Sequence, residues 1–138
     1  AVNSPEQGHR EVEHTADLEL EVWAPDMPAL IEEAARGMYG LMGVVVSAED
    51  RCHRQLEFSS DDGEQLLVSF LEELLIIAEA EDLAVDGFLF ALAGGNLLAR
   101  LEGGSIVSRD REIKAVTFHN LIIRETERGL QTRIIFDV

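Results

Sequence analysis

A stripe of hydrophobic residues at helical spacing constrains the fold of this chain more than any other feature of its sequence. The stripe runs from residue 66 to residue 78, with glutamates placed off it. Such spacing predicts an amphipathic helix that buries one apolar face. The members of the stripe are Leu66, Leu67, Phe70, Leu71, Leu74, Leu75 and Ala78. One helix length of stripe in a chain of this size indicates core packing, so we assign it no function of its own.

A second helix is predicted between Asp26 and Gly43. Asp26 is a suitable N-cap, Pro28 suits the second helical position, and Gly43 is a typical end. Apolar residues between them recur at helical spacing. Gly37 and Gly40 lie inside this pattern. They either weaken the helix or permit close packing against a neighbour.

The rest of the chain has the spacing of strands, with a period of two. The predicted strands are residues 10–13, 18–24, 44–46, 53–58, 88–93, 97–101, 113–125 and 130–136. The last four form two hairpins, around Gly94-Gly95-Asn96 and Glu127-Arg128-Gly129. Two helices and a strand-rich C-terminal half predict a single α+β domain over residues 1–138, with a mainly antiparallel sheet packed on the helices.

Charge narrows the classes of function. The 138 residues carry 11 basic and 27 acidic side chains, a net charge of −16. Independent nucleic-acid binding normally needs a basic stripe, and an anionic membrane also attracts basic segments, so neither is expected. An acidic surface suits a basic protein partner or a cation, although it also serves solubility alone.

Cellular location is inferred from what the sequence lacks. Cys52 is the only cysteine, which excludes an internal disulfide framework and fits a reducing compartment. No apolar run reaches the roughly 18 residues of a spanning helix, and no signal-peptide pattern opens the sequence. We therefore expect a cytoplasmic protein.

Familiar catalytic motifs are also missing from the sequence. It contains no GxxxxGK[ST] phosphate loop, no HExxH, no GxSxG and no CxxC pair. Cys52 and His53 are adjacent in a predicted strand, where their side chains point to opposite faces and cannot act as a nucleophile and base. These absences disfavour a self-contained hydrolase or transferase.

Carboxylates near the two ends of the sequence form the one candidate metal site. Asp17 precedes an N-terminal strand, and Asp137 and the Val138 carboxylate end the last strand. If those strands are neighbours, the oxygens converge and suit a hard cation, Ca²⁺ or else Mg²⁺ or Mn²⁺. The alternative is an Asx-turn at Asp17 and a solvated tail at Asp137.

Lys114 is the only lysine, since the other ten basic residues are arginines. Arginine does not replace lysine where a compact ammonium group is required, so the position is a candidate partner for carboxylates or phosphate. An ordinary strand cation is the alternative. His14 and His119 are candidate metal ligands or proton carriers, or else hydrogen-bonded structural histidines.

Four blocks of the sequence together resemble the archease family in order and spacing. They are Glu13-His14-Thr15-Ala16-Asp17, the residues 62–75 with the sequence DGEQLLVSFLEELL, residues 112–119 with EIKAVTFH, and Ile135-Phe136-Asp137-Val138. The resemblance implies an accessory protein that activates an RtcB-type RNA ligase and has no catalytic site of its own. Such ligases join RNA ends bearing a 3′-phosphate or 2′,3′-cyclic phosphate to a 5′-hydroxyl in tRNA splicing and RNA repair.

The resemblance also assigns residues. It implies that Asp17 and Asp137 hold a divalent cation and that Lys114 is the functional lysine, acting in GTP-dependent guanylylation of the ligase. Asn120 and Phe118 depart from the family, which often has aspartate and tyrosine there. Two other classes of function stay open, a metal-dependent enzyme acting on a small molecule and a chaperone-like interaction module. The first predicts a closed pocket beside the ion, and the second an exposed apolar patch without metal.

Overall fold

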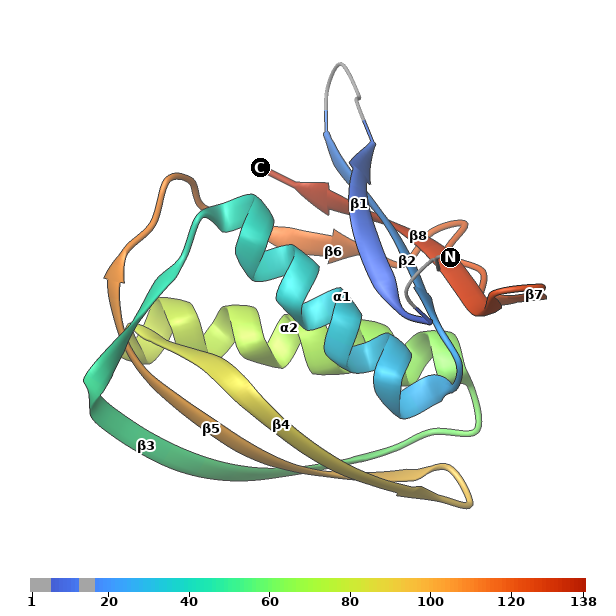
Figure 1. Cartoon of the computed structure of the whole chain (residues 1–138), viewed down its shortest axis with the longest axis horizontal. Helices are drawn as coiled ribbons and strands as arrows, with labels where there is room; N and C mark the ends of the chain where they lie inside the picture. The colour runs from blue at the N-terminus through green and yellow to red at the C-terminus, as the bar shows by residue number, and fades with distance from the viewer. Residues whose placement is uncertain (1–5, 13–16) are drawn as a thin grey trace.

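The computed structural model describes residues 6–12 and 17–138, and it places two helices between two antiparallel sheets (Figure 1). The helices are α1 (Met27–Met42) and α2 (Gly63–Glu81). One sheet has the order β1-β2-β8-β6, with β7 also paired to β8, and the other has the order β3-β5-β4. The strands are β1 (Gly8–Val12), β2 (Leu18–Ala24), β3 (Val45–Ser59), β4 (Leu83–Ala93), β5 (Asn96–Ser108), β6 (Ala115–Thr117), β7 (Arg124–Thr126) and β8 (Gly129–Asp137). The predicted α+β class is confirmed, with two sheets where the sequence predicted one.

Both helices begin and end where local chemistry directs. The Asp26 carboxylate accepts the N–H of Ala29 at 3.0 Å at the start of α1, and Gly43 ends the helix with a φ of 66°. Asp62 accepts the N–H of Glu64 at 3.0 Å at the start of α2. Capping depends on neighbours in sequence, and this explains why these boundaries were predictable.

The helices bury their apolar faces against both sheets. Phe70 on α2 is fully buried and lies between aromatic rings of the β3-β5-β4 sheet, with centroids 5.8 Å away at Phe58 and 5.4 Å away at Phe90. Leu20 on β2 and Phe136 on β8 are buried on the other side of the helices. The stripe on α2 is therefore core, as predicted.

Three predictions about strands were wrong. The predicted strands 44–46 and 53–58 are parts of one strand, β3, which begins at Val45 and whose pairing with β5 is interrupted by a bulge between Val46 and Arg51. The predicted strand over residues 113–125 is broken into β6 and β7 by a turn in which Asn120 has a φ of 62°. As a result, Lys114 lies just before a strand and not within one. Both predicted hairpin turns are confirmed. β7 pairs with β8 around Glu127-Arg128-Gly129, and the β4-β5 hairpin is longer than predicted, with Gly94 and Gly95 both at positive φ in its turn.

No helix in the described part of the chain is long and apolar enough to cross a membrane.

Candidate functional site

Segments from both ends of the sequence meet at one end of the β1-β2-β8-β6 sheet. Leu18 on β2 pairs with Phe136 on β8, and Asp137 pairs with Ala115 on β6. Asp17 immediately precedes the first of these pairs, and Asp137 immediately follows it. The backbone N–H of Lys114 donates to the carbonyl oxygen of Asp137 at 2.8 Å. The topology therefore brings Asp17, Asp137 and Lys114 to the same sheet end.

Strand alternation assigns the aspartates to one face of that end. Phe136 is fully buried in the core and Leu18 is 9% exposed, so the residues next to them in sequence belong to the opposite, outer face. Asp137 is exposed there, Asp17 is half-buried, and the Val138 side chain is 49% exposed. Asp137 is thus open to solvent at the end of β8, and Asp17 lies half-buried just before the neighbouring strand β2.

The donor set fits a hard cation in its chemistry, since it is made of carboxylate oxygens. Within residues 6–12 and 17–138, no group of three or more His, Cys, Asp or Glu side chains is arranged to hold a metal ion. The two aspartates and the chain end carry six carboxylate oxygens, the lower limit of the about six to eight that Ca²⁺ takes. A cation held by Asp17, Asp137 and Val138 therefore stays a prediction.

The Lys114 side chain lies in a groove beside this end. It is exposed and lines a hollow of about 600 Å³ together with α2 residues and the chain that joins β5 to β6. Its backbone bond to Asp137 fixes the lysine next to the aspartates in space, while the side chain itself borders α2. A functional role for Lys114 stays a prediction, and its position beside α2 was not predicted.

Of the two candidate histidines, His14 and His119, the structure describes only His119. His14 falls outside the described residues. His119 is exposed in the turn between β6 and β7, beside Phe118, which is 43% exposed. His9 contacts Glu33 of α1 through Nδ1 at 3.0 Å and links β1 to that helix.

Two glutamates on the outer face of the sheet are buried, which sequence reasoning missed. Glu19 is 8% and Glu21 is 4% exposed, although they alternate with the core residues of β2. Arg133 contacts Glu19 at 3.2 Å and Glu21 at 3.4 Å, and Arg10 contacts Glu21 at 3.2 Å. Arginines on both neighbouring strands cover and neutralise the two carboxylates. The sequence contains these glutamates and arginines, but only the register of β1, β2 and β8 shows which of them lie opposite each other.

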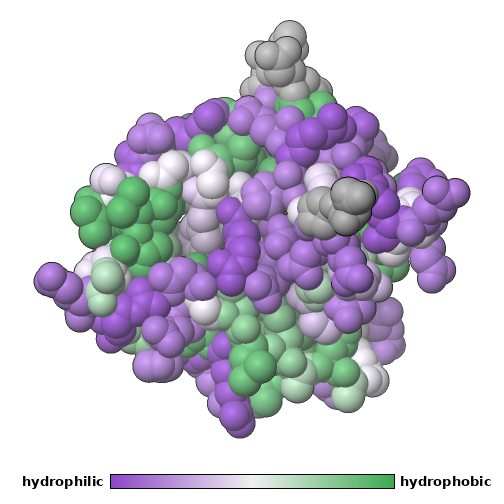
Figure 2. Space-filling model, viewed as in Figure 1, coloured by the Kyte–Doolittle hydropathy of each residue, from purple (hydrophilic) through white to green (hydrophobic). Residues whose placement is uncertain are grey.

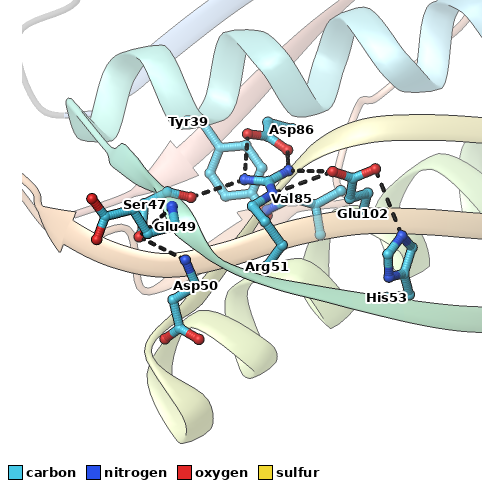
Figure 3. Close-up of polar contacts among 9 residues, drawn as sticks. All are labelled: Tyr39, Ser47, Glu49, Asp50, Arg51, His53, Val85, Asp86 and Glu102. Carbon is cyan, nitrogen blue, oxygen red and sulfur yellow. Dashed lines mark hydrogen bonds and ion pairs between the residues drawn. The ribbon is translucent and has the colours of Figure 1, made fainter.

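A second polar cluster has a structural explanation (Figure 3). The Arg51 guanidinium forms hydrogen bonds with Asp86, Glu102 and the carbonyl oxygen of Ser47, and these carboxylates hold its pKa above the ordinary value. Ser47 and Asp86 flank the irregular positions of β3 and β4. One fork-shaped side chain thus ties two strand irregularities together, and we assign this cluster no chemistry.

Comparison of the sequence with known proteins identifies the family to which the chain is similar. The chain matches the Archease protein family over residues 9–138. The protein archease of Methanopyrus kandleri is 33% identical over 132 residues, which cover 86% of this chain and 90% of that one. The protein archease of Thermococcus gammatolerans is 30% identical over 125 residues, covering 85% and 88%.

Two solved structures share the fold. Protein 1598 of Methanobacterium thermoautotrophicum has a TM-score of 0.72 at 24% identity, covering 95% of this chain and 99% of that one. An archease from Thermotoga maritima, described as a possible chaperone, has a TM-score of 0.70 at 22% identity, covering 100% and 98%. At these identities the two structures establish the arrangement of helices and sheets.

Proposed function

The chain belongs to the archease family, and from this premise we propose that it is a non-catalytic, cytoplasmic accessory protein that activates an RtcB-type RNA ligase. It promotes GTP-dependent guanylylation of the ligase and its multiple turnover in tRNA splicing or RNA repair. The observation that carries the proposal is the meeting of Asp137 and Lys114 at one exposed sheet end, through a backbone hydrogen bond of 2.8 Å. Lys114 and Asp137 belong to two of the four family blocks, and we propose that this sheet end is the working tip.

The proposed tip has distinct parts. Asp17, Asp137 and the Val138 carboxylate hold a divalent cation, with Ca²⁺ the first candidate and Mg²⁺ or Mn²⁺ the others. A cation held there supplies positive charge near the phosphates of nucleotidyl transfer. Lys114, whose backbone N–H bonds to Asp137, adds a compact ammonium group at the same sheet end. His14 belongs to the same family block as Asp17 and is proposed to assist at the tip.

Charge supports a protein partner over nucleic acid. A net charge of −16 repels RNA, whereas it steers the chain toward the basic surface that an RNA-processing ligase needs for its own substrate. The proposal therefore expects no independent binding of RNA.

The test is guanylylation of a purified RtcB-type ligase with GTP, followed by transfer of label to the ligase. Wild type accelerates labelling, whereas Asp137→Asn and Lys114→Ala do not. Asp61→Asn and Arg100→Ala, exposed residues far along the sequence from the tip, are the matched controls and act as wild type. Equal stimulation by all four variants contradicts the assigned tip, and absence of stimulation by wild type contradicts the function.

A chaperone-like role is the second candidate, because the face in Figure 2 gathers apolar residues at its lower edge, over the β3-β5-β4 sheet. Leu89 of β4 is 65% exposed in that sheet. This role predicts that the protein suppresses aggregation of an unrelated unfolded protein and that Leu89→Asp weakens the effect. The chaperone-like role is favoured over the ligase role if suppression of aggregation needs Leu89 and the wild-type chain does not accelerate labelling of the ligase.

A further inference from the structure

A groove runs between the C-terminal half of α2 and the chain from Arg109 to Ala115. In Figure 1 this chain leaves β5 near the end of α2 and rises to β6. The groove has a volume of about 600 Å³, and its apolar lining includes Leu75, Ile76 and Ile113. Ile76 is 58% exposed, whereas its helix neighbours Leu74 and Leu75 are buried.

One face of α2 supplies the long wall of the groove. Glu72, Leu75, Ile76 and Glu79 follow the spacing i, i+3, i+4 and i+7, so they form a continuous strip along the helix. Seven residues of helix span about 10 Å, roughly two turns. The strip therefore presents an apolar centre with a carboxylate at each end.

The rim of the groove is acidic. Glu72, Glu79 and Glu112 line it, against Lys114 and Arg109. The Arg109 guanidinium is bound to Asp82 at 2.7 Å, so its charge is already matched by a carboxylate. The remaining rim is net negative and suits a cationic ligand.

The groove is continuous with the proposed tip. Lys114 lines the groove, and its backbone N–H donates to Asp137 at the sheet end. A molecule that lies in the groove therefore contacts Lys114, whose backbone is bonded to the last strand at Asp137. A second copy of this chain is a poor occupant, because it brings the same acidic charge, and nucleic acid is a poor occupant for the same reason.

We propose that this groove binds a basic amphipathic segment of the RNA ligase, about two helical turns long. An apolar side chain of that segment packs on Ile76, and its arginine or lysine side chains contact Glu72 and Glu79. The inference rests on the proposed function and adds to it a docking surface that borders the working tip at Lys114. The groove provides affinity, and the tip acts on the guanylylation step.

The experiment measures binding of the labelled full chain to a purified RtcB-type ligase by fluorescence anisotropy, with guanylylation measured in parallel. Ile76→Asp and Glu79→Lys are each expected to weaken binding at least about tenfold, equivalent to about 1.4 kcal/mol. Leu89→Asp and Glu57→Lys make the same chemical changes at exposed positions on the β3-β5-β4 sheet and keep wild-type affinity. Circular dichroism confirms that each variant is folded.

The two activities separate groove from tip. The groove variants recover full stimulation when added in excess, because only affinity is reduced. Asp137→Asn binds as tightly as wild type and fails to stimulate at any concentration. The groove is refuted if Ile76→Asp and Glu79→Lys bind like wild type while wild type still stimulates. If wild type neither binds nor stimulates, the groove and the proposed function both fail.

Discussion

Substitution by alanine is expected to have opposite effects on stability at two glycines of α1, Gly37 and Gly40. Comparison of the two variants isolates one packing contact between α1 and the β1-β2 hairpin. A Cβ added at Gly37 meets Leu20 Cδ2 at 2.5 Å and the His9 ring at 3.0 Å. A Cβ added at Gly40 meets nothing within 4 Å, and Gly40 is exposed. Gly37 is therefore the point where the β1-β2 hairpin approaches the helix, and Gly40 is an ordinary helix position.

The magnitude follows from the two environments. Both Gly→Ala changes gain the same helix propensity, about 1 kcal/mol. Leu20 is 1% exposed and is held by its own core neighbours, so relief of the contact at Gly37 costs about 1 to 3 kcal/mol of overpacking. We expect Gly40→Ala to raise the free energy of unfolding by about 1 kcal/mol. The free energy of unfolding of Gly37→Ala is then expected to be lower than that of Gly40→Ala by the overpacking cost.

The assay is urea unfolding followed by circular dichroism, with the free energy of unfolding extrapolated to water for wild type and both variants. Comparison of the variants with each other cancels the propensity gain and leaves the contact with Leu20 and His9. Equal stability of Gly37→Ala and Gly40→Ala refutes the close approach of the hairpin to α1.

Three further predictions concern stability. Arg54 donates hydrogen bonds to Glu81 and lowers the pKa of that carboxyl. This pair therefore stabilises the fold at pH values above the ordinary glutamate pKa, and the stabilisation is lost as the pH falls through the lowered pKa. Glu81→Gln should flatten the acid side of the stability profile in thermal melts from pH 6 to pH 3, with Glu57→Gln for comparison; a profile like that of wild type contradicts the linkage. Arg51→Lys should lower the melting temperature more than Arg100→Lys, because an ammonium group cannot replace the fork that joins Ser47, Asp86 and Glu102; equal shifts argue against that role. Asp26→Ala should cost about 1 kcal/mol in urea unfolding by removing the N-cap of α1, and Asp26→Asn, which keeps a capping oxygen, should retain most of the stability.

The parts of the fold that depend on sequence neighbours were predictable. The caps at Asp26, Gly43 and Asp62, the helical stripe of α2 and the Gly94-Gly95 turn were all present in short windows of sequence. The interruptions were not predictable, because the bulge after Val46 and the break at Asn120 depend on the partner strands and on long-range packing. Division of the strands into two sheets has the same origin.

The pairing of the two terminal strands was predictable, whereas the function of the residues at their ends stays a prediction. The meeting of Asp17 with Asp137 required β2 and β8 to be neighbours, a condition that the pairing of Leu18 with Phe136 meets. The burial of Glu19 and Glu21 and the groove beside Lys114 required the register of three strands and the position of α2. Such features arise from which elements face each other, and a single sequence does not contain that information directly.

The most direct test of the ligase role is multiple turnover. A small amount of RtcB-type ligase is given a large excess of RNA with a 3′-phosphate end and a 5′-hydroxyl end, together with GTP and a divalent cation. With the wild-type chain, we predict many joined RNA molecules per ligase molecule, whereas with Asp137→Asn the yield stays near one per ligase. A yield near one with the wild-type chain, or many turnovers with Asp137→Asn, would contradict the account.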